Sequence, residues 1–151
     1  MIFLRKFCAL LILCAVFFTS CSPIFSADDS AVEKLYTVLT EFSLTEGAVF
    51  STEENEDYLF TDAMAERMFF WGRDISALSH AESTAVYVSR RFSSEEIVVA
   101  KLHDLSHRDE VETLFLSRAE KKKNAIVFCD GVYVYLVCAE NRDEIKRFLT
   151  K

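Results

Sequence analysis

The stretch that decides the fold of this chain is Asn124-Ala125-Ile126-Val127-Phe128-Cys129-Asp130-Gly131-Val132-Tyr133-Val134-Tyr135-Leu136-Val137-Cys138. Asp130-Gly131 is a dipeptide that favours a two-residue hairpin turn, because glycine adopts the positive φ that such turns need. The runs on both sides are rich in β-branched and aromatic residues, which is typical of strands. We therefore expect an antiparallel hairpin with strands over 124–129 and 132–138.

Alternate side chains of a strand point to opposite faces, so the hairpin should present two different surfaces. One face is entirely apolar and consists of Ala125, Val127, Cys129, Val132, Val134, Leu136 and Cys138. The other face is mixed and consists of Asn124, Ile126, Phe128, Tyr133, Tyr135 and Val137. The first face is expected to pack against helices. The second is expected to be only partly covered, which makes Tyr133 and Tyr135 candidate partner-binding residues.

Outward from the hairpin, the sequence predicts two more strands and four helices. Residues 83–89 and 96–102 carry β-branched, apolar runs joined by a polar connection, so they are expected to be neighbouring strands. Apolar residues at helical spacing predict helices over 29–43, 62–72, 106–121 and 140–150. The order β-β-α-β-β-α after two N-terminal helices predicts an α+β domain. Its sheet should be mainly antiparallel and four-stranded, with the two N-terminal helices packed on one face.

The first twenty residues have the organisation of an export signal. Arg5 and Lys6 form a basic start, and an unbroken apolar run of twelve residues follows over 7–18. This run is too short to cross a bilayer core comfortably. The tetrad Phe18-Thr19-Ser20-Cys21 resembles a lipobox, with phenylalanine in place of the usual leucine. We expect cleavage before Cys21 and acylation of its thiol with diacylglycerol.

The alternative for this segment is an uncleaved membrane helix over 1–18. The charges of Arg5 and Lys6 inside that span disfavour it. Either arrangement places the folded part outside the cytoplasm and tethered to the cell membrane. The predicted organisation is a lipoprotein signal peptide over 1–20, a lipid-anchored tether over 21–28 and a single α+β domain over 29–151.

The charge of the chain restricts its partners. Removal of residues 1–20 takes away two of the 17 Lys and Arg and none of the 24 Asp and Glu, so the net charge changes from −7 to −9. Phosphate binding needs a basic face, so this acidic balance argues against nucleic acid as a partner.

Two cysteines, Cys129 and Cys138, remain in the mature chain after Cys21. Across the predicted turn they would face residues 132 and 123, which places their thiols about 20 Å apart along the strands. A disulfide needs α-carbons within roughly 7 Å. We therefore expect two separate, buried thiols.

Three strand patterns of the chain resemble those of a known family: Tyr87-Val88-Ser89, Glu95-Glu96-Ile97-Val98-Val99-Ala100-Lys101 and Gly131-Val132-Tyr133-Val134-Tyr135-Leu136-Val137. With the export signal and the N-terminal helix, they are similar to an uncharacterised family of exported lipoproteins from clostridia-type bacteria, known as a domain of unknown function. The resemblance covers about residues 28–150. It implies a lipid-anchored protein at the extracytoplasmic face of the cell membrane, and it supplies no catalytic residues.

His103 and His107 are the candidate metal ligands, because histidines four residues apart on one helix can share an ion. His103 is expected to end a strand and His107 to open a helix, which argues against a shared face. The sequence places no third ligand beside them. A solvated helix start is therefore favoured, and no cofactor is predicted.

Trp71 is a candidate contact residue in the aromatic run Met68-Phe69-Phe70-Trp71-Gly72. Such a run can form a platform for a sugar or a peptide, although more often it is helix core with one or two residues at the rim. Adjacent Glu95 and Glu96 would point to opposite faces of a strand and cannot act together on one bond. The sequence contains no G-x-S-x-G motif and no glycine-rich phosphate loop, so no catalytic residue is predicted.

Two functions follow from these features. The first is a non-enzymatic lipoprotein of the cell envelope that binds an envelope protein or a wall component through Tyr133, Tyr135 and Trp71. The alternative is a small metal-assisted extracytoplasmic hydrolase that uses His103 and His107.

Overall fold

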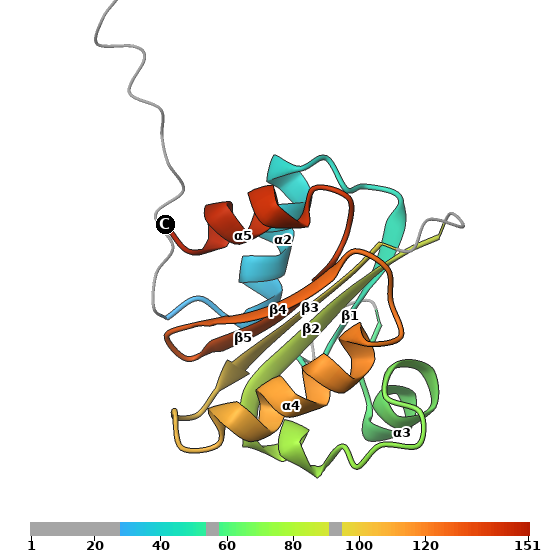
Figure 1. The fold of residues 1–151 in the computed structure, drawn as a ribbon, viewed down its shortest axis with the longest axis vertical. Helices are drawn as coiled ribbons and strands as arrows, with labels where there is room; N and C mark the ends of the chain where they lie inside the picture. The colour runs from blue at the N-terminus through green and yellow to red at the C-terminus, as the bar shows by residue number, and fades with distance from the viewer. Residues whose placement is uncertain (1–27, 54–57, 91–94) are drawn as a thin grey trace, which may run out of the picture.

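The computed structural model describes residues 28–53, 58–90 and 95–151 and shows an α+β domain built on one open antiparallel sheet (Figure 1). The predicted α+β class is confirmed. The predicted signal peptide over 1–20, the predicted lipidation site Cys21 and the predicted tether up to residue 27 lie outside the described residues.

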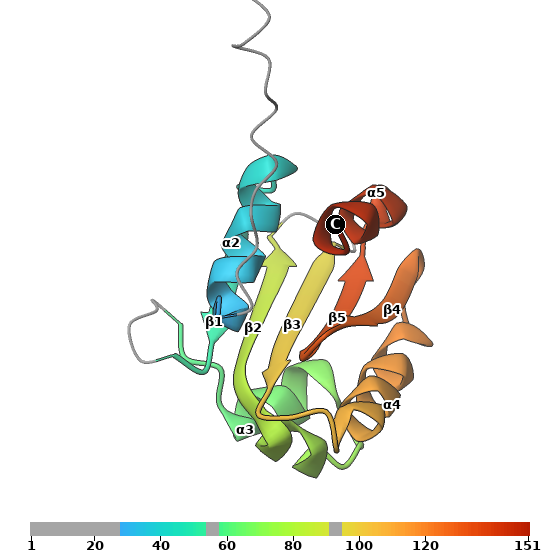
Figure 2. The same ribbon diagram turned by 90° about the vertical axis from the view of Figure 1, so that its left-hand side faces the viewer.

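The sheet has five strands in the order β1-β2-β3-β5-β4, which Figure 2 shows from one edge to the other. The strands are β1 (Gly47–Ser51), β2 (Ala81–Ser89), β3 (Glu96–Leu102), β4 (Ala125–Asp130) and β5 (Tyr133–Cys138). The helical segments are α2 (Ala31–Glu41), α3 (Asp62–Met64), a π-helical turn (Ala65–Phe69), a 3₁₀ turn (Ser76–His80), α4 (Arg108–Ala119) and α5 (Arg142–Leu149). In the part of the chain that the structure describes, no helix is long and apolar enough to cross a membrane.

β1 is the strand that the sequence did not predict, so the expectation of a four-stranded sheet is wrong. It is an edge strand whose neighbour in the sheet is β2, and its last residue, Ser51, also forms a parallel bridge with Leu59. Of its five residues, Ser51 alone is fully buried. A short, half-buried strand lacks the long apolar alternation that marks a strand in a sequence.

The predicted helix over 62–72 is a composite segment. Its cap is Thr61, whose Oγ1 accepts a hydrogen bond from the backbone N–H of Met64 at 3.3 Å. One turn of α3 passes into the π-helical turn, and Gly72 follows with a φ of +72°. The sequence therefore located the segment correctly but not its geometry.

Helices cover both faces of the sheet. Figure 1 shows α2 and α5 on one side and α3 and α4 on the other, so the prediction that both N-terminal helices pack on one face is wrong. Leu35 of α2 and Ile145 of α5 belong to the first apolar core. Phe69, Phe115 and Leu136 belong to a second core on the opposite face. Helices therefore cover both faces of the hairpin, completely along β5 and partly along β4.

The β4–β5 hairpin is present, but its turn lies one residue later than predicted. Asp130 pairs with Tyr133, so Gly131 and Val132 form the two-residue loop. Gly131 has a φ of +55°, and glycine at the first loop position is the preference of the type II′ turn. Each residue of β4 therefore faces a partner two positions later in β5 than predicted. Because side chains alternate with a period of two, they stay on the predicted faces.

Cys129 and Cys138 are separate free thiols, as predicted. Cys129 pairs with Val134 and Cys138 with Ala125, so the two thiols lie at different levels of the hairpin. Cys138 is buried, whereas Cys129 is only half-buried. Burial raises the pKa of Cys129 to about 11, which keeps this thiol protonated at neutral pH.

Glu96, the first residue of β3, is a buried carboxylate with a side chain that is 1 % exposed. Arg118 of α4 donates from Nε to its Oε1 at 3.0 Å and from Nη2 to its Oε2 at 2.7 Å, and Lys122 Nζ lies 2.9 Å from Oε2. Burial alone would raise the pKa of Glu96, but the hydrogen bonds and charges of Arg118 and Lys122 outweigh it and hold that pKa below its usual value. An ionised carboxylate thus fastens the end of α4 to the sheet.

Candidate functional site

Tyr133, predicted to lie on a partly uncovered face, is buried. The prediction is wrong because α2 and α5 cover that face of the sheet. The hydroxyl of Tyr133 donates to the carbonyl oxygen of Asp29 at 2.5 Å, and Lys34 Nζ lies 4.7 Å from the centroid of its ring. Burial, together with the negative charge of Asp29, raises the pKa of Tyr133 to about 12. This tyrosine therefore holds the start of the domain in place.

Tyr135, the second predicted partner-binding tyrosine, is fully buried. Its ring stacks on the ring of Phe128, with 4.9 Å between centroids, and on that of Tyr133 at 6.0 Å. Among the described residues, its hydroxyl finds no hydrogen-bond partner. Burial raises the pKa of Tyr135 strongly. The core therefore uses the ring of Tyr135 and leaves its hydroxyl unsatisfied.

Trp71 is the most exposed large apolar side chain of the described residues, at 78 %. Its neighbour Phe70 turns inward and stacks on Phe115, with 5.9 Å between the ring centroids. The aromatic run is thus divided between core and surface. Trp71 is accessible to a partner, and its role in partner binding stays a prediction.

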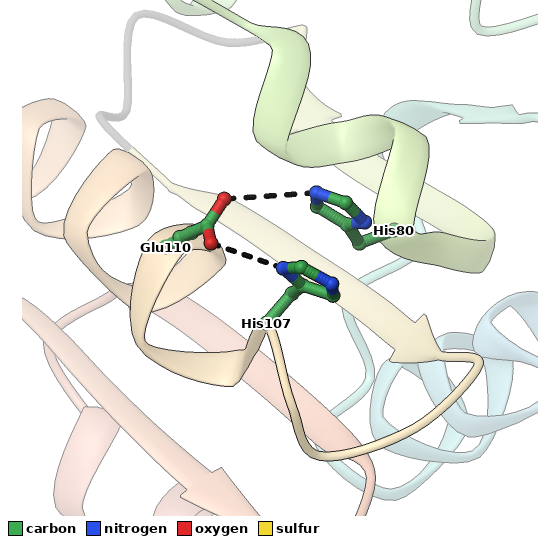
Figure 3. A group of neighbouring side chains, drawn as sticks. All are labelled: His80, His107 and Glu110. Atoms are coloured by element: carbon green, nitrogen blue, oxygen red, sulfur yellow. Dashed lines mark hydrogen bonds and ion pairs between the residues drawn. The ribbon is translucent and has the colours of Figure 1, made fainter.

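The structure does not bring the two candidate metal ligands, His103 and His107, into one ligand group. His107 precedes the first turn of α4, whereas His103 lies exposed in the turn that follows β3. No described group of three or more possible metal ligands contains His103. The group that does form contains His80, His107 and Glu110 (Figure 3).

His80, the last residue of the 3₁₀ turn, faces His107 across the start of α4. The two imidazole rings are stacked, with 3.6 Å between centroids and 4° between planes. Glu110 lies beside both rings: its Oε1 is 3.0 Å from His107 Nδ1, and its Oε2 is 3.6 Å from His80 Nε2. The first distance is that of a hydrogen bond and the second is too long for one. The two histidines and one carboxylate can hold a metal ion or share a proton.

His80 was missed because the sequence separates it from His107 by 26 residues and by two strands. Only the sheet topology brings the 3₁₀ turn next to α4. The chain has three histidines, so His80 was the one further histidine that could have been considered as a ligand beside His103 and His107. The backbone N–H of His103 donates to the carbonyl of His80 at 3.1 Å, so all three come to one corner of the domain.

A groove of about 430 Å³ lies between α2 and β1. It exists because α2 packs mainly on β2 and β3 and leaves β1 only partly covered on this face. Its lining residues are Tyr36, Leu39, Thr40, Leu44, Thr45, Gly47, Ala48, Val49, Tyr58, Tyr87 and Arg90. The ring of Tyr87 lies so close over Gly47 that a Cβ there would fall 2.1 Å from it, so glycine permits this packing.

The groove combines aromatic rings, hydroxyls and one positive charge. Tyr36 and Tyr58 are each about half-exposed, and Arg90 Nη2 donates to the hydroxyl of Tyr58 at 3.5 Å. Arg90 is the only charged side chain among the described residues that line the groove. Ligand sites commonly have this size and this mixture of apolar walls with a few polar groups.

Comparison of the chain with protein-family models, with curated proteins and with solved structures finds no match. The resemblance to the family of exported lipoproteins therefore stays a prediction.

The two buried tyrosines give a matched test of the core. Tyr135→Phe is expected to leave the free energy of unfolding unchanged or to raise it, because it removes a buried hydroxyl without a partner. Tyr133→Phe is expected to lower it by about 1 kcal/mol, since its hydroxyl bonds to Asp29. Urea unfolding followed by circular dichroism measures both variants. A larger loss in Tyr135→Phe than in Tyr133→Phe would contradict the assignment of these hydroxyls.

Proposed function

We propose that this chain is a non-enzymatic lipoprotein of the cell envelope, anchored at the extracytoplasmic face of the membrane through diacylglycerol on Cys21. The lipobox-like tetrad supports this anchor, and so does the short stretch of chain between Cys21 and the first helix of the domain. Nine residues separate Cys21 from Ala31, where α2 begins. Because an extended chain spans at most about 3.5 Å per residue, α2 would start within about 35 Å of the lipid surface. The domain would therefore act close to the membrane.

The ligand that we propose is a saccharide of the cell wall, neutral or anionic, bound in the groove between α2 and β1. The groove carries this proposal, because its exposed tyrosines offer flat apolar faces and polar hydroxyls together. Sugar rings present C–H faces that pack on such rings, and their hydroxyls can bond to Thr40, Thr45 and Arg90. A single cation in an otherwise acidic chain favours a neutral or negatively charged ligand over a cationic one.

The alternative function, a metal-assisted hydrolase, was predicted on His103 and His107. Among the described residues, His107 shares a ligand group with His80 and Glu110 and not with His103. The groove that we propose as the binding site is lined by none of the three histidines. We therefore favour binding over hydrolysis.

The anchor is tested by intact mass and membrane fractionation of the wild type and Cys21→Ala. We expect a chain that starts at Cys21, carries an added mass of diacylglycerol size and sediments with membranes. The modification should be lost in Cys21→Ala and kept in the control Cys14→Ala, because only Cys21 is the last residue of the lipobox-like tetrad. An unmodified wild-type chain that retains residues 1–20 would refute the anchor.

The groove is tested by calorimetric titration with soluble oligosaccharides cut from the glycan strands of the wall. Tyr36→Ala and Tyr58→Ala are each expected to weaken binding by about 10-fold, the loss of roughly 1.4 kcal/mol that one aromatic contact supplies. Leu116→Ala is the control, since Leu116 is exposed but does not line the groove, and Trp71→Ala tests the exposed tryptophan as an alternative contact. If Trp71→Ala abolishes binding and the tyrosine variants do not, the ligand binds elsewhere and the groove assignment is wrong.

A further inference from the structure

His80, His107 and Glu110 form a compact set of potential metal ligands that the proposed function does not use. One nitrogen of each imidazole and a carboxylate oxygen all lie within 4.8 Å of one another. They come from two separate segments, the 3₁₀ turn and the start of α4 (Figure 3). All three side chains are partly exposed, so an ion can reach them from solvent.

The spacing of these atoms fits a small ion. A tetrahedral ion bound at about 2.1 Å to nitrogen and oxygen keeps its ligand atoms about 3.4 Å apart. In the structure, Glu110 Oε1 lies 3.0 Å from His107 Nδ1 and Glu110 Oε2 lies 3.6 Å from His80 Nε2. One atom from each of the three side chains lies within 4.8 Å of the other two. Small side-chain rotations therefore suffice to bring the three ligand atoms to tetrahedral spacing.

The stacked imidazoles must open slightly to accept an ion. The lone pairs of parallel rings lie in two parallel planes, whereas two nitrogen ligands must direct theirs at one metal. Rotation about χ2 of each histidine provides this change, because χ2 of histidine has a broad energy profile. The rings are partly exposed, so the rotation displaces little of the core.

We propose that His80, His107 and Glu110 bind one divalent transition-metal ion of the Zn²⁺ type. Two imidazoles and one carboxylate favour such an ion over Ca²⁺ or Mg²⁺, which prefer sites made of oxygen. Three protein ligands leave the fourth position to water or to an exchangeable ligand. The ion joins the 3₁₀ turn before β2 to the first turn of α4, two segments that already contact each other. It therefore stabilises the folded domain by binding it in preference to the unfolded chain.

The test is a zinc titration of the full-length chain in detergent micelles, purified without a histidine tag, with unfolding temperature as a second readout. We expect one Zn²⁺ per chain and a rise in unfolding temperature with added zinc. His80→Ala and His107→Ala should each weaken zinc binding by about 100-fold or more, and Glu110→Gln by at least about 10-fold. Near-ultraviolet circular dichroism confirms that each variant is folded.

Two control variants make the result specific to these ligands. His103→Ala removes the third histidine, which adjoins His80 through its backbone but lies outside the ligand group. Asp109→Asn removes an exposed charge from the same helical turn as Glu110. Both should bind zinc as the wild type does. The proposal is overturned if the wild type takes up no stoichiometric zinc, if His80→Ala and His107→Ala bind it unchanged, or if His103→Ala loses it equally.

Discussion

The arrangement of this domain depends on one buried ionic contact, between Glu96 and the two cations Arg118 and Lys122. Glu96 starts the central strand β3, and its carboxylate would be costly inside the fold without both partners. The same guanidinium lies 5.8 Å from the centroid of the Phe69 ring, so the contact reaches the π-helical turn as well. β3, α4 and the segment after α3 are thereby joined at one point, which fixes the helices on that face of the sheet.

Burial of the sheet on both faces determines where function can lie. β5 is buried along its whole length because it lies between β3 and β4, with helices above and below. The tyrosines of β5 are consequently part of the core. The candidate binding sites lie where the helices that cover the sheet end. One is the partly covered face of β1 beside α2, where the groove forms. Another is the gap between the 3₁₀ turn and α4, where His80 meets His107.

The sequence predicted local features well and long-range ones poorly. The side-chain alternation of 124–138 placed Tyr133 and Tyr135 together on one face, which is correct, because alternation depends only on strand geometry. Whether that face is covered depends on α2 and α5, and their packing is not encoded within the hairpin. The contact of His80 with Glu110 was missed for the same reason, whereas β1 was missed because it is short and half-buried. The lipobox lies outside the described residues and stays a prediction from sequence.

The most direct measurement of the central contact is the free energy of unfolding of wild type and Glu96→Gln as a function of pH. Because the folded pKa of Glu96 lies below its ordinary value of 4.5, its contribution is complete above that pH. It is lost as pH falls through the lower folded pKa. We expect Glu96→Gln to be less stable by about 2 kcal/mol at neutral pH, with the difference vanishing in acid. The exposed control Glu120→Gln should change little. An equal stability of Glu96→Gln and wild type at neutral pH, or a difference that persists unchanged into acid, would contradict the role of this contact.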